Sequence, residues 1–94
     1  MTDLSERHCA LAFLTDALFC SELEIGSTPS EKGMAAAIYG ALKAHLNWDG
    51  CTRAVAAAFC EDIASATRRE AWCRQLAAQA LDAGDITSGF DGRA

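Results

Sequence analysis

Residues 51–83 contain neither glycine nor proline, and alanine is the commonest residue among them. Such a stretch is typical of helix, because alanine has the highest helix propensity and the two residues that most disfavour a helix are absent. Thr67 and Glu70 have the spacing of a capping box. We therefore expect one helix from 51 to about 64 and another from 67, with a bend or short break at 65–67. A single continuous helix is the alternative.

Two further helices are expected earlier in the chain. Polar residues near the N-terminus can begin a first helix over about 2–24, and Gly26 follows it as a left-handed cap. Residues 28–31, Thr-Pro-Ser-Glu, have the form of a capping box with proline at the first helical position. They predict a second helix over about 29–46.

The second and third helices should be joined by a turn at residues 47–50, Asn-Trp-Asp-Gly, because asparagine, aspartate and glycine favour turns. Within this turn Asp49 is the expected N-cap of the third helix. Trp48 is expected to close one end of the bundle as an apolar plug.

Small residues line one face of the expected second helix, namely Gly33, Ala37, Gly40 and Ala44. Glycine inside a helix costs about 0.5–1 kcal/mol relative to alanine. Two glycines on one face therefore predict that another helix backbone packs closely there.

These signals predict an all-α fold, because no stretch alternates over four or more β-branched positions as a strand would. We expect a small up-and-down bundle of three to four helices with short loops. A chain of 94 residues makes one domain, placed here at 1–84. Residues 85–94 are expected to be a flexible tail, in which Ile86 and Phe90 could dock on the bundle.

The net charge of −5 is unevenly placed, since residues 1–30 hold five acidic side chains and one arginine. An acidic chain binds nucleic acid and anionic lipid poorly, so we expect no direct contact with nucleic acid or membrane. No signal peptide and no apolar run of about 20 residues is present, which predicts a cytoplasmic protein. The second half of the chain contains a basic cluster, which we expect to form salt bridges or to contact a partner. It comprises Arg53, Arg68, Arg69 and Arg74.

The five cysteines contain no C-x-x-C pair, which excludes the usual redox and zinc-ribbon motifs. We expect them to be thiols that act as small buried apolar residues. Two alternatives remain open. One is a disulfide between helices or subunits, and the other is a metal site assembled from several helices with His8 or His45. Either would make the protein a metal- or thiol-dependent ligand-binding or sensor bundle.

No catalytic constellation is apparent. The chain lacks a glycine-rich phosphate loop, a nucleophile elbow and an H-E-x-x-H motif. His8 and Cys9 are neighbours in sequence but point about 100° apart on a helix, so they do not form a nucleophile pair. We therefore expect no enzymatic activity and no cofactor.

The expected first helix is apolar on nearly all sides, so it either lies between other helices or presents a surface to a partner. We favour the second interpretation, with acidic and apolar residues as the contact set: Asp16, Phe19, Glu22, Leu23 and Glu24. Such a surface suits a protein with a basic groove. The chain is thus predicted to be a small protein-interaction module that binds and inhibits a partner. By analogy of size and charge, a phage-encoded inhibitor such as an anti-CRISPR protein is the most specific form of this hypothesis. A homodimer would bury surface that an alanine-rich core leaves exposed.

Overall fold

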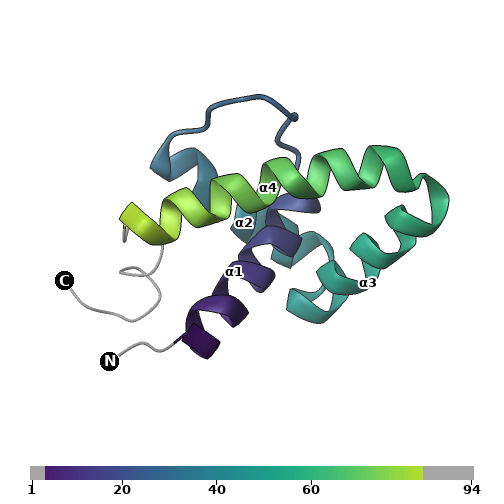
Figure 1. Cartoon of the computed structure of the whole chain (residues 1–94), viewed down its shortest axis with the longest axis horizontal. Coiled ribbons are helices and arrows are strands. Elements are labelled where there is room, and N and C mark those ends of the chain that lie inside the picture. Colours follow the sequence, from purple (N-terminus) through teal and green to yellow (C-terminus); the bar gives the residue numbers. More distant parts are fainter. Residues whose placement is uncertain (1–3, 84–94) are drawn as a thin grey trace.

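Figure 1 shows the computed structural model, which describes residues 4–83. This part of the chain forms four helices, α1 (Leu4–Phe19), α2 (Glu31–Ala44), α3 (Asn47–Glu61) and α4 (Ile63–Ala83). No strand occurs within it, and the predicted small all-α bundle is confirmed. The expected tail at 85–94, with Ile86 and Phe90, lies outside the described residues.

The first helix, α1, contacts each of the other three helices. The longest helix, α4, crosses α1 steeply, and α3 folds back beside α4 as a helical hairpin (Figure 1). An ion pair between Arg7 and Asp82 connects the start of α1 with the end of α4. Leu14, Ala17 and Leu18 of α1 are buried between the other helices, whereas Phe13 on the same helix is 47% exposed.

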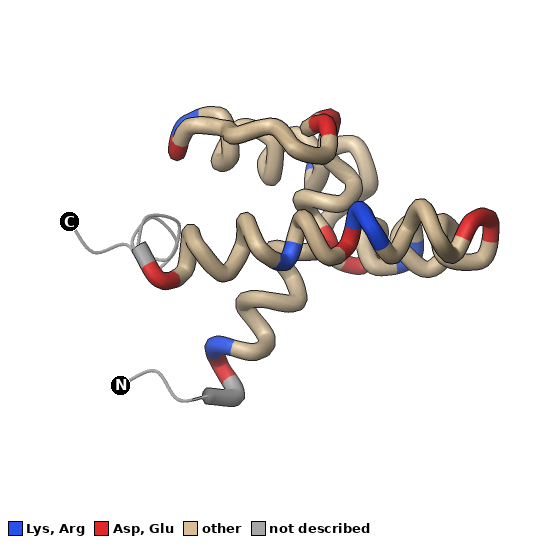
Figure 2. Tube along the Cα trace, turned by 45° about the horizontal axis from the view of Figure 1, so that its top comes forward, with Lys and Arg blue, Asp and Glu red and all other residues tan. Residues whose placement is uncertain are grey.

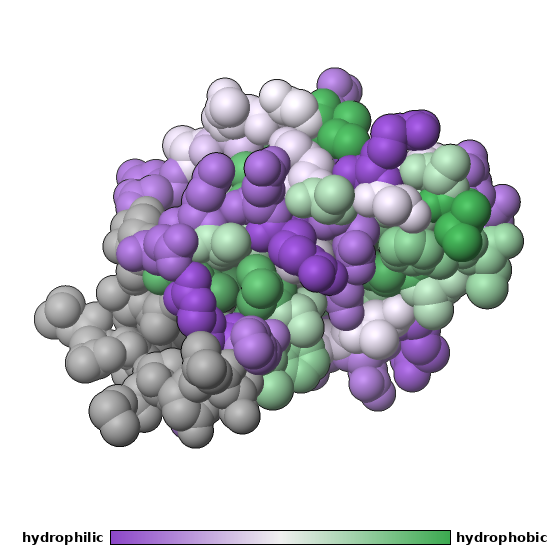
Figure 3. All heavy atoms as spheres, viewed as in Figure 1, coloured by the Kyte–Doolittle hydropathy of each residue, from purple (hydrophilic) through white to green (hydrophobic). Residues whose placement is uncertain are grey.

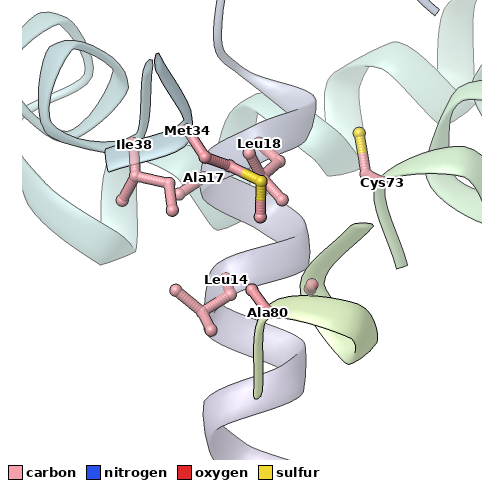
Figure 4. Close-up of a cluster of buried hydrophobic side chains, with 8 residues drawn as sticks. Leu14, Ala17, Leu18, Met34, Ile38, Cys73 and Ala80 are labelled. Atoms are coloured by element: carbon pink, nitrogen blue, oxygen red, sulfur yellow. The ribbon is translucent and has the colours of Figure 1, made fainter. Parts of the chain in front are cut away.

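The core is formed by side chains of α1, α2 and α4, shown in Figure 4: Leu14, Ala17, Leu18, Met34, Ile38, Cys73, Ala77 and Ala80. Half of these eight side chains are alanine or cysteine, so the helices can approach closely and the larger side chains fill the space between them. Trp48 packs against this cluster, and its ring centroid lies 5.5 Å from that of Phe13. Trp48 therefore packs on the core from the first turn of α3 and not from a turn between helices.

The first helix ends at Phe19, so the prediction that it continues to Glu24 was wrong. Beyond it, the backbone N–H and the hydroxyl of Ser21 both donate to the carbonyl of Leu18, at 3.1 and 2.6 Å. A continuing helix would offer that carbonyl to the residue four positions on. Gly26 does adopt a left-handed backbone, with φ +89°, but it lies in the following loop and caps no helix.

The second helix begins at Glu31, and its N-cap is Ser30, not the predicted Thr28. The hydroxyl of Ser30 accepts a hydrogen bond from the backbone N–H of Gly33 at 3.0 Å. Serine and threonine are both good caps, and here the extended backbone at Ser30 (ψ 170°) selects the serine. Pro29 therefore lies outside the helix.

The turn between α2 and α3 is shorter than predicted. The helix α2 ends at Ala44, and Leu46 and Asn47 take positive φ values of 60° and 85°, which reverse the chain at once. Consequently α3 begins at Asn47, and the stretch 47–50 is helical, not a turn. Asp49 lies within the first turn of α3 and is not its N-cap.

Gly50 makes this short connection sterically feasible. A Cβ atom built there would lie 1.5 Å from the carbonyl oxygen of His45. The close packing predicted for the small-residue face of α2 is absent from the described chain. A Cβ at Gly40 would meet nothing within 4 Å, and one at Gly33 would meet only Ser30 and Pro29.

The break between α3 and α4 exists as predicted, but it lies at Asp62 and not at 65–67. Asp62 is extended (φ −153°), and its carboxylate accepts a hydrogen bond from the backbone N–H of Ser65 at 3.1 Å. This aspartate cap satisfies a donor in the first turn of α4. Thr67 lies inside α4, where its hydroxyl donates to the carbonyl of Ile63.

Candidate functional site

The connection from α1 to α2, residues 20–30, is the longest loop in the described chain and carries negative charge only. We call it the acidic loop. Figure 1 shows it arching away from the helices, and Figure 2 marks the acidic positions along its trace. Glu22, Glu24 and Ile25 are exposed along it, and 52% of the Ile25 surface is accessible.

The base of the acidic loop is held by Arg69 of α4. Its guanidinium donates to the carbonyls of Phe19 at 2.8 Å and Ser21 at 3.0 Å, with a longer contact to Leu18 at 3.4 Å. These carbonyls form the C-terminal end of α1, which has no basic residue in its own last turn. A cation at a helix C-terminus is stabilised by the unpaired carbonyls and the helix dipole.

Aromatic rings enclose the same guanidinium. Its central carbon lies 5.7 Å from the ring centroid of Phe19 and 5.9 Å from that of Trp72. The ring of Phe19 stacks in turn on Phe59 of α3, with centroids 6.2 Å apart. Three helices therefore fix the point at which the acidic loop leaves α1.

Local hydrogen bonds shape the rest of the loop. The backbone N–H of Leu23 donates to the hydroxyl of Ser21 at 3.3 Å, and Leu23 itself packs against the core. The backbone N–H and the hydroxyl of Ser27 both donate to the carbonyl of Glu24, at 3.1 and 2.7 Å. This second turn presents Glu24 and Ile25 outward from a defined backbone.

The five predicted contact residues do not form one surface. Phe19 and Leu23 are half-buried and pack on the core, and Asp16 accepts a hydrogen bond from the Thr52 hydroxyl at 3.0 Å. Only Glu22 and Glu24 are exposed, and they belong to a loop, not to a helix. Ile25, which is exposed beside them, was not among the predicted contact residues.

The environment of Asp16 is that of a partly buried internal group. Desolvation raises the pKa of its carboxyl, and the nearby Glu70 acts in the same direction. The hydrogen bond from Thr52 and the charge of Arg74 oppose that rise. Asp16 thus connects α1 with α3 and is a weaker candidate for partner contact than the two glutamates of the loop.

Cys20, which is half-buried, and the buried Cys51 and Cys73 have thiols that are poorly suited to chemistry. Burial raises the pKa of Cys20 to about 12, helped by the neighbouring Cys51, and raises that of Cys73 to about 11. The pKa of Cys51 is raised as well, again mainly by burial. The thiolate is the reactive and metal-binding form of cysteine, so these shifts favour a packing role. The remaining thiols, Cys9 and Cys60, are exposed.

Cys20 provides a pH test of this packing role. In the folded protein its thiol stays protonated to about pH 12, whereas in the unfolded chain it ionises near its ordinary value of 9.0. Its contribution to stability is therefore complete below pH 9 and is lost as the pH rises toward 12. We expect urea unfolding at pH 7–11 to show a shallower alkaline loss for Cys20→Ala than for wild type. The exposed-thiol variant Cys60→Ala should retain the wild-type slope, and equal slopes for all three would contradict the assignment.

Among the described residues, no group of three or more histidine, cysteine, aspartate or glutamate side chains is placed to hold a metal ion. No helix among them is long and apolar enough to cross a membrane. Comparison of the chain with models of protein families, with curated proteins and with solved structures finds no match.

Proposed function

We propose that the protein is an interaction module that binds a basic surface of a partner protein through the acidic loop. The observation that carries this proposal is the exposure of Glu22, Glu24 and Ile25 on a backbone that Arg69 anchors at Ser21 and that a turn from Glu24 to Ser27 shapes locally. Two carboxylates beside an apolar side chain combine electrostatic steering with a desolvated contact.

The anchoring supports recognition because a loop that is already ordered loses less conformational entropy on binding. Arg69 holds the loop where it leaves α1, and Ser27 holds the turn around Glu24. The exposed face carries no basic side chain, since residues 20–30 contain neither lysine nor arginine. A partner with lysine and arginine side chains would meet no like charge there.

We further propose that binding inhibits the partner in the cytoplasm. A basic groove that accepts acidic side chains is often one that receives nucleic acid, so occupation by the acidic loop would exclude that ligand. A phage-encoded inhibitor of the anti-CRISPR type is the most specific form of this proposal. It is supported by the charge, the small size and the exposed loop.

Charge reversal tests the proposal. Immobilised wild-type protein and the double variant Glu22→Lys/Glu24→Lys would be used to capture proteins from host extract, followed by quantitative mass spectrometry. We expect the partner to be depleted about tenfold or more by the double variant, because two attractive charges become repulsive. The fold should be intact, since both side chains are exposed and in a loop.

Asp49→Lys is the matched control, because it changes an exposed carboxylate of α3 to the same cation. It should capture the partner as well as wild type does. The purified partner should also lose nucleic-acid binding when wild-type protein is added. Equal capture by the double variant would remove the acidic loop from the binding surface.

A further inference from the structure

The side of α2 that points away from the core carries both lysines of the protein. Each residue of a helix advances by about 100°, so four exposed residues of α2 fall within about 60° of arc on this side. We call them the lysine face: Lys32, Ala36, Tyr39 and Lys43. The opposite side of the helix buries Met34, Ile38 and Ala41. The lysine face is thus left uncovered by the rest of the described chain.

The two lysines are free cations within residues 4–83, because neither makes an ion pair there with another side chain. Lys43 lies in the last turn of α2, where the helix dipole favours a cation. Lys32 lies in the first turn, where the same dipole disfavours one, so the stability of the helix does not explain it. The two residues are separated by about 16 Å along the helix.

An aromatic side chain lies between the two lysines on this face. Tyr39 has 73% of its surface accessible, although tyrosine is a residue type that is enriched in the buried centres of interfaces. The exposed residues around it are small, namely Ala35, Ala36 and Gly40. A Cβ at Gly40 would meet nothing within 4 Å, so the described chain leaves open space there. A second helix could therefore approach α2 closely on this side.

The turn from α3 to α4 also carries apolar side chains at the surface (Figure 3). Ile63 is 69% exposed there, but the exposed acids Glu61 and Asp62 directly precede it. Apolar and acidic groups are mixed at that turn. On the lysine face, by contrast, the charges lie at the two ends and the tyrosine lies between them.

The charges of the lysine face indicate which partner it fits. A two-fold pairing of two α2 helices in register would set lysine against lysine, whether the helices run parallel or antiparallel, so a second copy is disfavoured. We infer that the lysine face docks an acidic amphipathic helix of another protein, with a carboxylate near each lysine and an apolar side chain against Tyr39. This surface is separate from the acidic loop and has the opposite charge.

Photo-crosslinking from the full chain in its host tests the docking. With Tyr39→p-benzoylphenylalanine, we expect a crosslinked peptide of another protein that has acidic residues along one helical face. Gln75→p-benzoylphenylalanine is the matched control, because Gln75 is exposed on α4, and its yield should be at least tenfold lower. Equal yields at the two positions would overturn the inference. So would a crosslinked peptide that comes from a second copy of this chain or that lacks an acidic face.

Charge reversal in the Tyr39 crosslinking variant tests the role of the lysines. Lys32→Glu/Lys43→Glu should lower the crosslinking yield about tenfold, because both attractive charges become repulsive. The helix should persist, since both side chains are exposed and unpaired in the described chain, and circular dichroism would check this. Arg53→Glu/Arg68→Glu, the same reversal at exposed positions of α3 and α4, should leave the yield unchanged. An equal yield with the lysine variant would show that charge does not select the partner, and the inference would be wrong.

Discussion

Arg69→Ala is expected to lower the free energy of unfolding by about 3 kcal/mol, the largest effect that we expect for a charged residue of this protein. The guanidinium donates to the carbonyls of Phe19 and Ser21 and lies against the rings of Phe19 and Trp72. Hydrogen bonds from a charged group contribute about 1.5–3 kcal/mol each, and a cation beside an aromatic ring adds about 0.5–1 kcal/mol. Their removal leaves the end of α1 without its cation.

Urea unfolding followed by far-ultraviolet circular dichroism would measure this loss. Arg69→Lys should lose roughly half as much, since one ammonium cannot reproduce the planar fork of donors. Arg53→Ala is the control for removing an arginine from a helix. Arg53 is largely exposed, and within residues 4–83 its one ion pair is with Asp49 on the same helix, so its loss should change stability by about 0.5 kcal/mol or less. An Arg69→Ala variant as stable as the control would show that the contacts contribute little.

Gly50→Ala is expected to destabilise the protein by about 2–4 kcal/mol, because the added methyl group would overlap the backbone of His45. The added Cβ would lie 1.5 Å from the carbonyl oxygen of His45 and 2.6 Å from its carbonyl carbon. The connection cannot easily yield, since Leu46 and Asn47 already hold positive φ values. Relief would require α3 to begin later or to separate from α2.

Gly40→Ala is the same chemical change at another position, and it is expected to have the opposite effect on the stability of the protein. Gly40 lies inside α2, and an added Cβ would meet nothing within 4 Å. Replacement by alanine should therefore stabilise the helix by about 0.5–1 kcal/mol. Thermal unfolding of the two variants beside wild type would decide the matter. Equal stabilities for the two variants would show that the short α2–α3 connection is wrong.

The effect of Arg69 on the stability of the protein also bears on the proposed function. Arg69 contacts no exposed surface of the acidic loop, yet it fixes where that loop leaves α1. A change at Arg69 should thus reduce partner binding by loosening the loop, whereas the changes at Glu22 and Glu24 should reduce it with stability unaltered. Measuring both quantities for each variant separates anchoring from contact.

The sequence by itself determined the helical class of this protein and the approximate number of helices. Alanine-rich stretches without proline have few alternatives to helix, because the preference is local and adds up over many residues. The break in 51–83 and a short α2–α3 connection were also foreseeable, although each lies a few residues from its predicted place.

Only the tertiary structure decided where each helix ends and which residues face outward. The carbonyl of Phe19 at the end of α1 accepts a hydrogen bond from Arg69, which is 50 residues away in sequence, so no local signal could reveal this contact. Glu22 and Glu24, which were expected in the first helix, lie instead in an exposed loop together with Ile25. Glycine is likewise required at position 50 only because the carbonyl group of His45 occupies the space that a Cβ atom would need. Helix propensity is a property of neighbouring residues, whereas competition for a backbone carbonyl is settled by whichever side chain the fold brings to it.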